Sequence, residues 1–228
     1  MNEVYFATLR QQMIGDIAVH TNHARSQIGK EALDTQVMGI MGKVPRHEFV
    51  PVELQLYAYC DTPLPIGYDK TISQPFIVAL MTDLLDLAET DTVLEIGTGL
   101  GYQAAILAEL AHKVHSIEII EELAQQAHLR LHRMGYANID TRVGDGYYGW
   151  PEAAPFDKII VTAAPELIPP PLIRQLKCGG RLVLPAGLPD SQKLMLVQKD
   201  GVGNLSTKEI LDVRFSPLEG DEDRRCYS

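Results

Sequence analysis

The segment at positions 92–102, which reads TVLEIGTGLGY, restricts the possible folds of this chain more than any other segment. It begins with a short apolar run that is typical of a buried parallel strand. Three glycines at alternate positions follow, and residues 104–108 continue as an apolar segment that is typical of a helix. A strand, a glycine turn and a helix form the first unit of a nucleotide-binding α/β fold, because glycine permits positive φ and a helix N-terminus offers free N–H groups.

The spacing of the glycines indicates which ligand this turn accepts. A dinucleotide-binding turn reads GxGxxG, whereas Gly97, Gly99 and Gly101 are evenly spaced, so the third glycine comes one residue early. Glu95, just before the turn, disfavours a pyrophosphate and suits a cationic ligand. S-adenosylmethionine is such a ligand, since it carries a sulfonium and an ammonium and no phosphate. The alternative is a tight turn that binds no ligand.

The composition excludes several classes of protein. A length of 228 residues is enough for one good-sized domain or two small ones, and the formal net charge of −10 argues against binding of nucleic acid through its phosphates. Cys60, Cys178 and Cys226 show no CxxC spacing, which fits a reducing compartment and argues against a structural zinc. The sequence has no apolar run of about 18 residues and no signal-peptide core, so we expect a soluble cytoplasmic protein.

The region ahead of the glycine turn is expected to be helical at its start and irregular later. Apolar residues at helical spacing predict helices within residues 1–42, with a loop over the polar stretch 20–30. His20 and His23 are three positions apart, as metal ligands can be, but no carboxylate or thiol cluster accompanies them, so we expect them on a solvated surface. Residues 57–68 carry two prolines and a glycine and are expected to be irregular.

A helix is expected to begin close to Ser73. Serine is a good N-cap, and Pro75 is tolerated in the first turn of a helix. Apolar residues follow at i, i+3, i+4, i+7 and i+8, which predicts a buried helix face. These residues are Ile77, Leu80, Met81, Leu84 and Leu85.

Strand and helix patterns alternate beyond the glycine turn, as in a parallel sheet with helices between its strands. Glu118 ends the second strand, about 20 positions after Gly97, where such folds place an acid for ribose hydroxyls; it is alternatively an ordinary strand-end carboxylate. Asp145, after the third strand, can accept a hydrogen bond from an adenine amino group or only shape a turn. Helices are predicted at 121–134 and from the prolines at 169–171 to Lys177, and Gly179 and Gly180 are expected to stop the second of them. Strands are predicted at 93–96, 114–117, 139–143, 156–161, 181–185, 194–199 and 210–215.

Six segments together resemble the protein-L-isoaspartate O-methyltransferase family. They read VPRHEFVP, PLPIGYDKTISQP, VLEIGTGLGYQAA, VGDGYYGWPEAAPFDKIIVTAA, LIRQLKCGGRLVLP and RFSPL, and they cover roughly residues 43–218. The glycine turn and the GGRL segment occur widely among class I methyltransferases, whereas the PLPIGYDKTISQP block is specific to this family.

The resemblance implies an α/β fold with a Rossmann-like, seven-stranded methyltransferase sheet, helices on both of its faces and an N-terminal helical extension. One methyltransferase domain is expected to span residues 1–228. Within it, residues 1–42 form the extension, 43–91 a substrate-side cap and lead-in helix, 92–218 the Rossmann-like core and 219–228 a tail.

The resemblance also implies an activity. The chain is expected to transfer a methyl group from S-adenosylmethionine to the free α-carboxylate of L-isoaspartyl residues in damaged proteins and peptides, which releases S-adenosylhomocysteine and initiates repair through a succinimide. No metal, nucleic acid or membrane is expected to take part. The alternatives are a methyltransferase acting on RNA, another small carboxylate or another protein, a non-catalytic cofactor-binding protein of the same fold, and a dehydrogenase, which the early third glycine disfavours.

Site residues follow from the resemblance by position. Ser73 matches the active-site serine of the family. Animal members have a histidine where this chain has Phe76, and some members have a hydroxyl residue where it has Glu219, so those two roles are not carried over. The expected cofactor-binding residues are Thr71, Ile72, Glu95, Gly97, Thr98, Gly99, Gly101, Glu118, Asp145 and Gly146, and the expected substrate residues are Ser73, Gln74, Pro75, Ala164 and Val213.

Overall fold

The computed structural model describes residues 3–220. The chain divides into two compact units, Met1–Asp83 and Leu84–Ser228, and each is described by itself. The boundary between the units falls inside one helix, eight residues before the start of the core expected from the sequence at position 92. The organisation as one methyltransferase domain stays a prediction.

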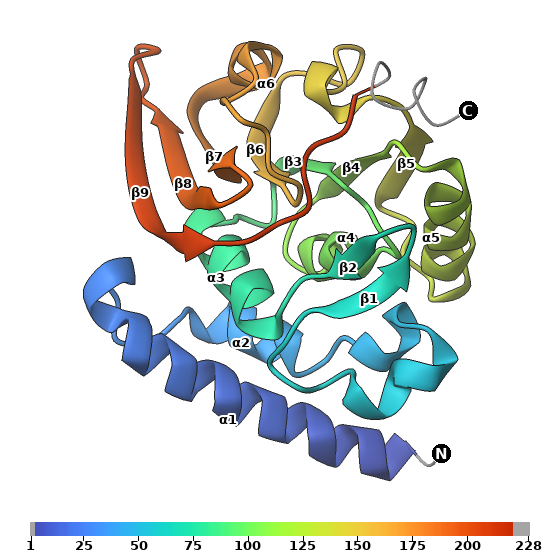
Figure 1. The fold of residues 1–228 in the computed structure, drawn as a ribbon. Helices are drawn as coiled ribbons and strands as arrows, with labels where there is room; N and C mark the ends of the chain where they lie inside the picture. Colours follow the sequence, from blue (N-terminus) through green and yellow to red (C-terminus); the bar gives the residue numbers. More distant parts are fainter. Residues whose placement is uncertain (1–2, 221–228) are drawn as a thin grey trace. The chain divides into compact units, whose positions relative to one another are not determined.

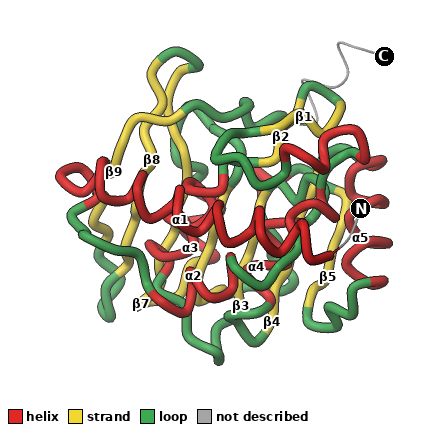
Figure 2. The backbone as a smooth tube through the Cα atoms, turned by 90° about the horizontal axis from the view of Figure 1, so that it is seen from below, coloured by secondary structure: helices red, strands yellow, loops and turns green. Residues whose placement is uncertain are grey.

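The first unit begins with a helix longer than its sequence suggested. Helix α1 runs from Glu3 to Ile28 without interruption (Figure 1 and Figure 2), so the loop predicted over residues 20–30 is wrong for most of its length. The helix continues because Thr21, Ala24 and Ile28 extend its buried stripe at spacings of three and four. The unit further contains α2 (Thr35–Met41), the 3-10 helices η1 (Arg46–Phe49) and η2 (Val52–Tyr57), and the start of α3 (Pro75–Leu85).

A short hairpin replaces part of the irregular stretch expected at 57–68. Strands β1 (Leu64–Gly67) and β2 (Lys70–Ile72) pair antiparallel, with Leu64 opposite Ile72. Tyr68 and Asp69 form the turn at φ of 54° and 55°. The prolines concealed this strand in the sequence, but Pro65 lies at an exposed position of β1, where proline is tolerated in a sheet.

The second unit is built on a seven-stranded sheet, which confirms the predicted fold. Its strand order is β5-β4-β3-β6-β7-β8-β9 (Figure 1). Strands β3 to β7 are parallel, and β8 is antiparallel to both of its neighbours, β7 and β9. The strands are β3 (Thr92–Ile96), β4 (Lys113–Glu118), β5 (Ile139–Val143), β6 (Phe156–Val161), β7 (Leu176–Leu188), β8 (Ser191–Lys199) and β9 (Leu205–Val213).

Helices cover both faces of this sheet. From β3 the chain proceeds through α4 (Tyr102–Ala108) and α5 (Glu121–Arg133) toward β5, and it later returns through β6 and α6 (Pro170–Gln175) in the other direction. Because parallel crossovers are right-handed, α4 and α5 lie on one face and α6 on the other. The strand order reverses beside β3, and ligands of such sheets bind at the carboxyl ends of the strands at this point.

Two sequence predictions in this unit differ from the structure. Gly179 and Gly180 do not stop a helix ahead of the strand; β7 already begins at Leu176 and runs through both glycines, with an irregular register opposite Phe156. The last strand begins at Leu205 rather than at 210, because β8 and β9 pair as a long hairpin whose outer residues are exposed and polar. Apolar periodicity therefore marked only the buried parts of these strands.

Candidate cofactor and substrate sites

The glycine turn after β3 has positive φ at all three glycines and leaves no room for a side chain at Gly97. Gly97, Gly99 and Gly101 have φ of 94°, 55° and 98°, a region that side chains disfavour. The N–H of Gly97 donates to the carbonyl of Ile117 at 2.8 Å, and its carbonyl accepts from the hydroxyl of Thr162 at 2.7 Å. A Cβ at Gly97 would lie 2.4 Å from that hydroxyl oxygen. The turn is thus held between β4 and the end of β6.

Glu118 lies next to the turn, as its position in the sequence predicted. Its Oε2 accepts from the N–H of Gly99 at 2.8 Å and its Oε1 from the N–H of Ile120 at 3.0 Å. Only 7% of the residue is exposed. A carboxylate oxygen has two lone pairs, so each oxygen keeps acceptor capacity for a ligand hydroxyl.

Glu95 lies behind the turn instead of lining it. The residue is fully buried, and its Oε2 accepts from the Ser116 hydroxyl at 2.5 Å. Ser116 in turn lies 2.5 Å from the hydroxyl of Thr98 in the turn. Burial, with the nearby charge of Glu118, raises the pKa of Glu95 to about 8. Within residues 3–220, Oε1 of Glu95 has no hydrogen-bond partner.

Asp145 and Gly146 lie at the carboxyl end of β5, and Gly146 packs against the end of β3. The Asp145 carboxylate accepts from the N–H of Tyr147 at 2.8 Å, which caps the 3-10 helix η3 (Gly146–Tyr148). A Cβ at Gly146 would lie 2.2 Å from Cγ2 of Ile96, directly before the glycine turn. The structure therefore brings the predicted adenine and methionine residues to the same edge of the sheet.

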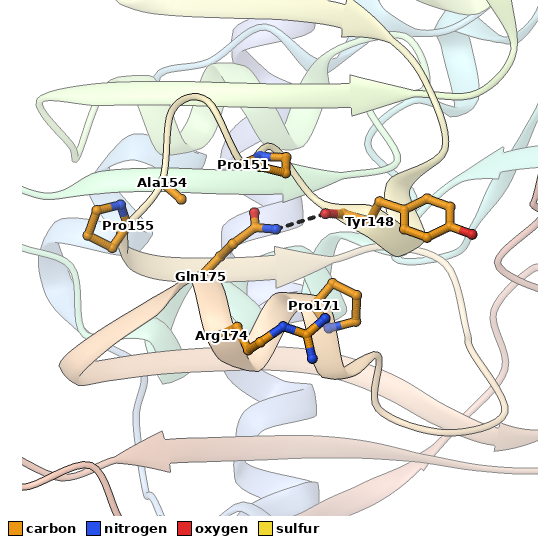
Figure 3. Close-up of a pocket in the computed structure, with 7 residues that line it drawn as sticks. All are labelled: Tyr148, Pro151, Ala154, Pro155, Pro171, Arg174 and Gln175. Carbon is orange, nitrogen blue, oxygen red and sulfur yellow. Dashed lines mark hydrogen bonds between the residues drawn. The ribbon is translucent and has the colours of Figure 1, made fainter.

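A glutamine from α6 holds the loop that follows η3. Gln175 accepts from the N–H of Trp150 at 2.8 Å. It donates to the carbonyl of Tyr148, also at 2.8 Å (Figure 3). A cavity of about 480 Å³ lies beside this contact. Its lining residues, none of which is a predicted site residue, are Tyr148, Pro151, Ala154, Pro155, Pro171, Arg174 and Gln175.

The predicted substrate residues of the second unit, Ala164 and Val213, flank the RFSPL segment. Ala164 donates its N–H to the carbonyl of Ser216 at 2.8 Å and accepts from the N–H of Leu218 at 2.9 Å. Val213 ends β9 opposite Gln192, whose side-chain amide bonds the backbone of Phe215 in both directions, at 2.6 and 3.1 Å. The segment is thus attached at both its ends.

Ser73 is not the cap of α3, so that prediction is wrong. The helix begins at Pro75, and Asp61 takes the capping role because its Oδ1 accepts from the N–H of Phe76 at 2.8 Å. The carbonyl of Ser73 accepts from Nη2 of the fully buried Arg46 at 2.7 Å. Within residues 3–220 the Ser73 hydroxyl makes no hydrogen bond, so it keeps both its proton and its lone pairs for a ligand.

Gln74 and His20 complete this part of the first unit. Nε2 of Gln74 donates to the backbone oxygen and to Oδ2 of Asp61, at 3.0 and 3.1 Å. His20 has 42% of its side chain exposed, and it also places Nδ1 2.9 Å from the same Oδ2 and stacks on Phe76, contacts that the sequence did not predict. The remaining predicted residues of this unit, Thr71 and Ile72, lie on β2, with Thr71 exposed and Ile72 buried.

Sequence reasoning missed several residues that hold the site. Asp61 lies two positions ahead of the family-specific block, and Arg46 lies in the VPRHEFVP segment. Their positions in or beside these segments could have marked both residues as candidates. The contacts of His20, Ser116 and Gln175 left no signal, because each joins segments far apart in the chain.

Two further findings concern metals and membranes. In the part of the chain that the structure describes, no three His, Cys, Asp or Glu side chains are grouped so that they could hold a metal ion. No described helix combines the length and the apolar character needed to cross a bilayer. Cys60 and Cys178 are free and exposed, and Cys226 lies outside the described residues.

Residues 23–223 match the family described as protein-L-isoaspartate(D-aspartate) O-methyltransferase. A protein-L-isoaspartate O-methyltransferase 1 of Polaromonas sp. is 65% identical over 222 residues, which cover 97% of this chain and 94% of that protein. A protein-L-isoaspartate O-methyltransferase 2 of Syntrophobacter fumaroxidans is 56% identical over 216 residues, covering 94% and 87%.

Solved structures agree with the fold. A protein-L-isoaspartate O-methyltransferase with 28% identity superposes with a TM-score of 0.79 over 95% of this chain and 69% of that one. A putative protein-L-isoaspartate O-methyltransferase of Plasmodium falciparum, in complex with S-adenosyl-L-homocysteine, has a TM-score of 0.74 at 22% identity and covers 90% of this chain and 98% of that one. This second likeness supports the fold alone.

Proposed function

This chain belongs to the protein-L-isoaspartate(D-aspartate) O-methyltransferase family, and on that basis we propose which of its residues perform the methyl transfer. The enzyme transfers a methyl group from S-adenosylmethionine to the free α-carboxylate of L-isoaspartyl residues. The observation that carries this function is the 65% identity, over 97% of the chain, to a relative named for the same reaction.

The residues at the carboxyl edge of the sheet fit S-adenosylmethionine. Two positions at this edge have room for backbone only, since a Cβ at Gly97 in the turn or at Gly146 after β5 would meet a neighbouring atom within 2.4 Å. A buried strand-end carboxylate, Glu118, lies beside the turn, which disfavours a phosphate and suits a ligand without one. When bound, the cofactor supplies an electrophilic methyl group on a sulfonium.

The roles of these residues follow from their chemistry. Glu118 accepts hydrogen bonds from ribose hydroxyls, because it is a carboxylate with acceptor capacity left after binding Gly99 and Ile120. Asp145 and Gly146 bind the adenine, and the three-glycine turn with Thr98 holds the methionine end, with Thr71 and Ile72 beside the sulfonium. Glu95 acts on the turn through Ser116 and Thr98.

The substrate needs orientation rather than deprotonation. A carboxyl group with a reference pKa of about 3.9 is ionised at neutral pH, so no general base is required for it to act as the nucleophile. The hydroxyl of Ser73 donates to one carboxylate oxygen and thereby directs the other toward the methyl group. Gln74, Pro75, Ala164 and Val213 line the path of the peptide. Rate enhancement then comes from positioning and from removal of water.

The natural substrates are proposed to be damaged proteins and peptides that contain L-isoaspartyl residues, and the methyl ester formed leads to a succinimide and so to repair. We propose that the chain forms a single methyltransferase domain and that it acts in the cytoplasm. Two observations support the location: the described cysteines are unpaired, and the cysteine spacing in the sequence fits a reducing compartment.

The test compares two peptides that differ at one linkage. Purified enzyme and methyl-labelled S-adenosylmethionine are incubated with an L-isoaspartyl peptide or with its normal L-aspartyl twin. We expect alkali-labile label in the isoaspartyl peptide only. Equal labelling of both peptides, or labelling of neither, would contradict the assignment of the substrate.

A further inference from the structure

The long N-terminal helix contributes a side chain to the Ser73 turn, although most of this helix lies outside the residues that match the family. The match begins at residue 23, whereas His20 lies on α1 ahead of it. Nδ1 of His20 is 2.9 Å from Oδ2 of Asp61, and the imidazole stacks on the ring of Phe76 with centroids 4.0 Å apart and planes 3° apart. Asp61 is mostly buried, with 13% of its side chain exposed.

Asp61 connects this helix to Gln74 and Phe76, which lie one and three positions after Ser73. Its Oδ1 accepts from the N–H of Phe76 at 2.8 Å. Its Oδ2 accepts from Nε2 of Gln74 at 3.1 Å and from Nδ1 of His20, and its backbone oxygen accepts from the same Nε2 at 3.0 Å. One carboxylate therefore fixes the start of α3, the side chain of Gln74 and the imidazole.

These contacts determine which way the Gln74 amide faces. Both Asp61 oxygens are acceptors, so the NH₂ group must face them and the carbonyl oxygen must face away. The reverse orientation would place an acceptor against two acceptors, and these partly buried lone pairs would remain unsatisfied. Within residues 3–220, Oε1 of Gln74 makes no hydrogen bond. It is an acceptor held in one direction, one residue after the Ser73 hydroxyl.

We propose that His20 and Asp61 are positioning residues for substrate recognition, which hold the Gln74 side chain so that its carbonyl oxygen accepts a backbone N–H of the isoaspartyl peptide. This inference rests on the proposed substrate role of the Ser73 turn. An acceptor directed at peptide N–H groups adds to the recognition of a carboxylate by Ser73, because a polypeptide offers such donors and a small carboxylic acid does not. Helix α1 thereby has a function in peptide binding as well as in packing.

The principal variant is Asp61→Asn, which reverses the polarity of this contact with little change of shape. The new NH₂ group can no longer accept from Gln74 or from His20, so the glutamine amide is held only by the backbone oxygen of residue 61, while the remaining side-chain oxygen still accepts from the N–H of Phe76. Peptide affinity, measured by calorimetry with S-adenosylhomocysteine present, is expected to fall about tenfold, while the affinity for S-adenosylhomocysteine changes by less than about twofold. One lost hydrogen bond of ordinary strength corresponds to this factor.

The second variant is His20→Phe, which keeps a ring on Phe76 and removes the nitrogen that contacts Asp61. His23→Phe is its matched control, because His23 is exposed on the same helix. We expect peptide KM to rise about threefold or more for His20→Phe and to be unchanged for His23→Phe, with kcat and melting temperature alike in the two. His20→Asn, which retains a donor for Asp61, should restore most of the affinity.

Hydrogen exchange of the Phe76 amide provides a readout that does not depend on turnover. The amide should exchange faster in His20→Phe than in His23→Phe, because Asp61 loses one of its supports. Wild-type peptide affinity in folded Asp61→Asn and His20→Phe would overturn the inference and leave the network a packing feature. If the wild type binds the peptide but transfers no methyl group, the proposed function fails while the affinities still decide this inference.

Discussion

At the scale of single residues, the structure separates the two roles that Ser73 was expected to combine. Asp61 caps α3, so the hydroxyl of Ser73 contributes no capping bond. We expect Ser73→Ala to lower kcat on an isoaspartyl peptide by on the order of a hundredfold, since misplacement of the nucleophile by about 1 Å has this effect. The melting temperature should change by no more than about 1 °C, because the change removes no described hydrogen bond.

Ser73→Thr is the control for this change, because it keeps the hydroxyl. Steady-state kinetics at a temperature where both variants are folded by circular dichroism decide the matter. Near wild-type kcat in Ser73→Ala would remove the serine from the catalytic assignment, whereas activity retained by threonine and lost by alanine would identify the hydroxyl as the active group.

Glu118 is expected to contribute to cofactor affinity through charge-assisted hydrogen bonds. Glu118→Ala should weaken binding of S-adenosylhomocysteine by about 1.5–3 kcal/mol, the range for such bonds. Calorimetric titration measures this loss, and Glu122→Ala, an exposed acid four positions later on α5, provides the control. An unchanged dissociation constant in Glu118→Ala would place the ribose elsewhere.

Glu95 is expected to make the stability of the protein depend on pH. Burial raises its pKa from 4.5 to about 8. Between these two pH values the native state therefore keeps a proton that the unfolded state has released. The stabilisation by this proton is complete below pH 4.5 and is lost as the pH rises to about 8. The isosteric Glu95→Gln variant has no ionisable group at this position and lacks the effect. The melting temperature of the variant minus that of the wild type should therefore increase between pH 5 and pH 8. A difference that stays constant over this range would show that Glu95 ionises normally.

At the scale of elements, the loop between β5 and β6 depends on its contact with α6. Gly149 has φ of 64° and ψ of −147°, a region nearly restricted to glycine, and a Cβ there would lie 2.4 Å from Oε1 of Gln175. Strain and overpacking together predict that Gly149→Ala lowers the free energy of unfolding by about 2–3 kcal/mol. Asp145 and Gly146 lie in the same loop, so cofactor affinity should fall as well.

Gly201→Ala is the control for this change. Gly201 lies in the turn between β8 and β9, and no atom lies within 4 Å of its Cβ position. Its free energy of unfolding, measured in urea, should stay within about 0.5 kcal/mol of the wild type. Equal stability of the two variants would contradict both the backbone strain at residue 149 and the overpacking against Gln175.

At the scale of the whole molecule, the chemistry of the substrate predicts methyl transfer without a metal. The carboxylate nucleophile is already ionised at neutral pH and needs no Lewis acid to activate it. We expect methyl transfer to an isoaspartyl peptide to be unaffected by an excess of EDTA. Activity that disappears with EDTA and returns with one divalent cation would contradict this expectation.

Much of the second unit was predictable from the sequence because its determinants are local. The apolar run, the three glycines and the helix that follows are consecutive in the chain, from residue 92 to residue 108, and each residue's own conformational preference favours the observed β3-turn-α4 arrangement. Glu118 was identified for the same reason, since a parallel sheet aligns the carboxyl ends of β3 and β4 and so brings the acid to Gly99.

The sequence by itself therefore determined the sheet, the glycine turn and the acid beside it. Tertiary structure alone decided the surroundings of Ser73 and the length of α1. His20 and Asp61 are 41 positions apart, and Arg46 and Ser73 are 27 apart. Hydrogen bonds over such separations depend on where packing brings the backbone, and local propensity carries no information about that. For the same reason a serine typical of an N-cap yielded the cap to Asp61, and a polar stretch typical of a loop became helix once its few apolar residues found a buried face.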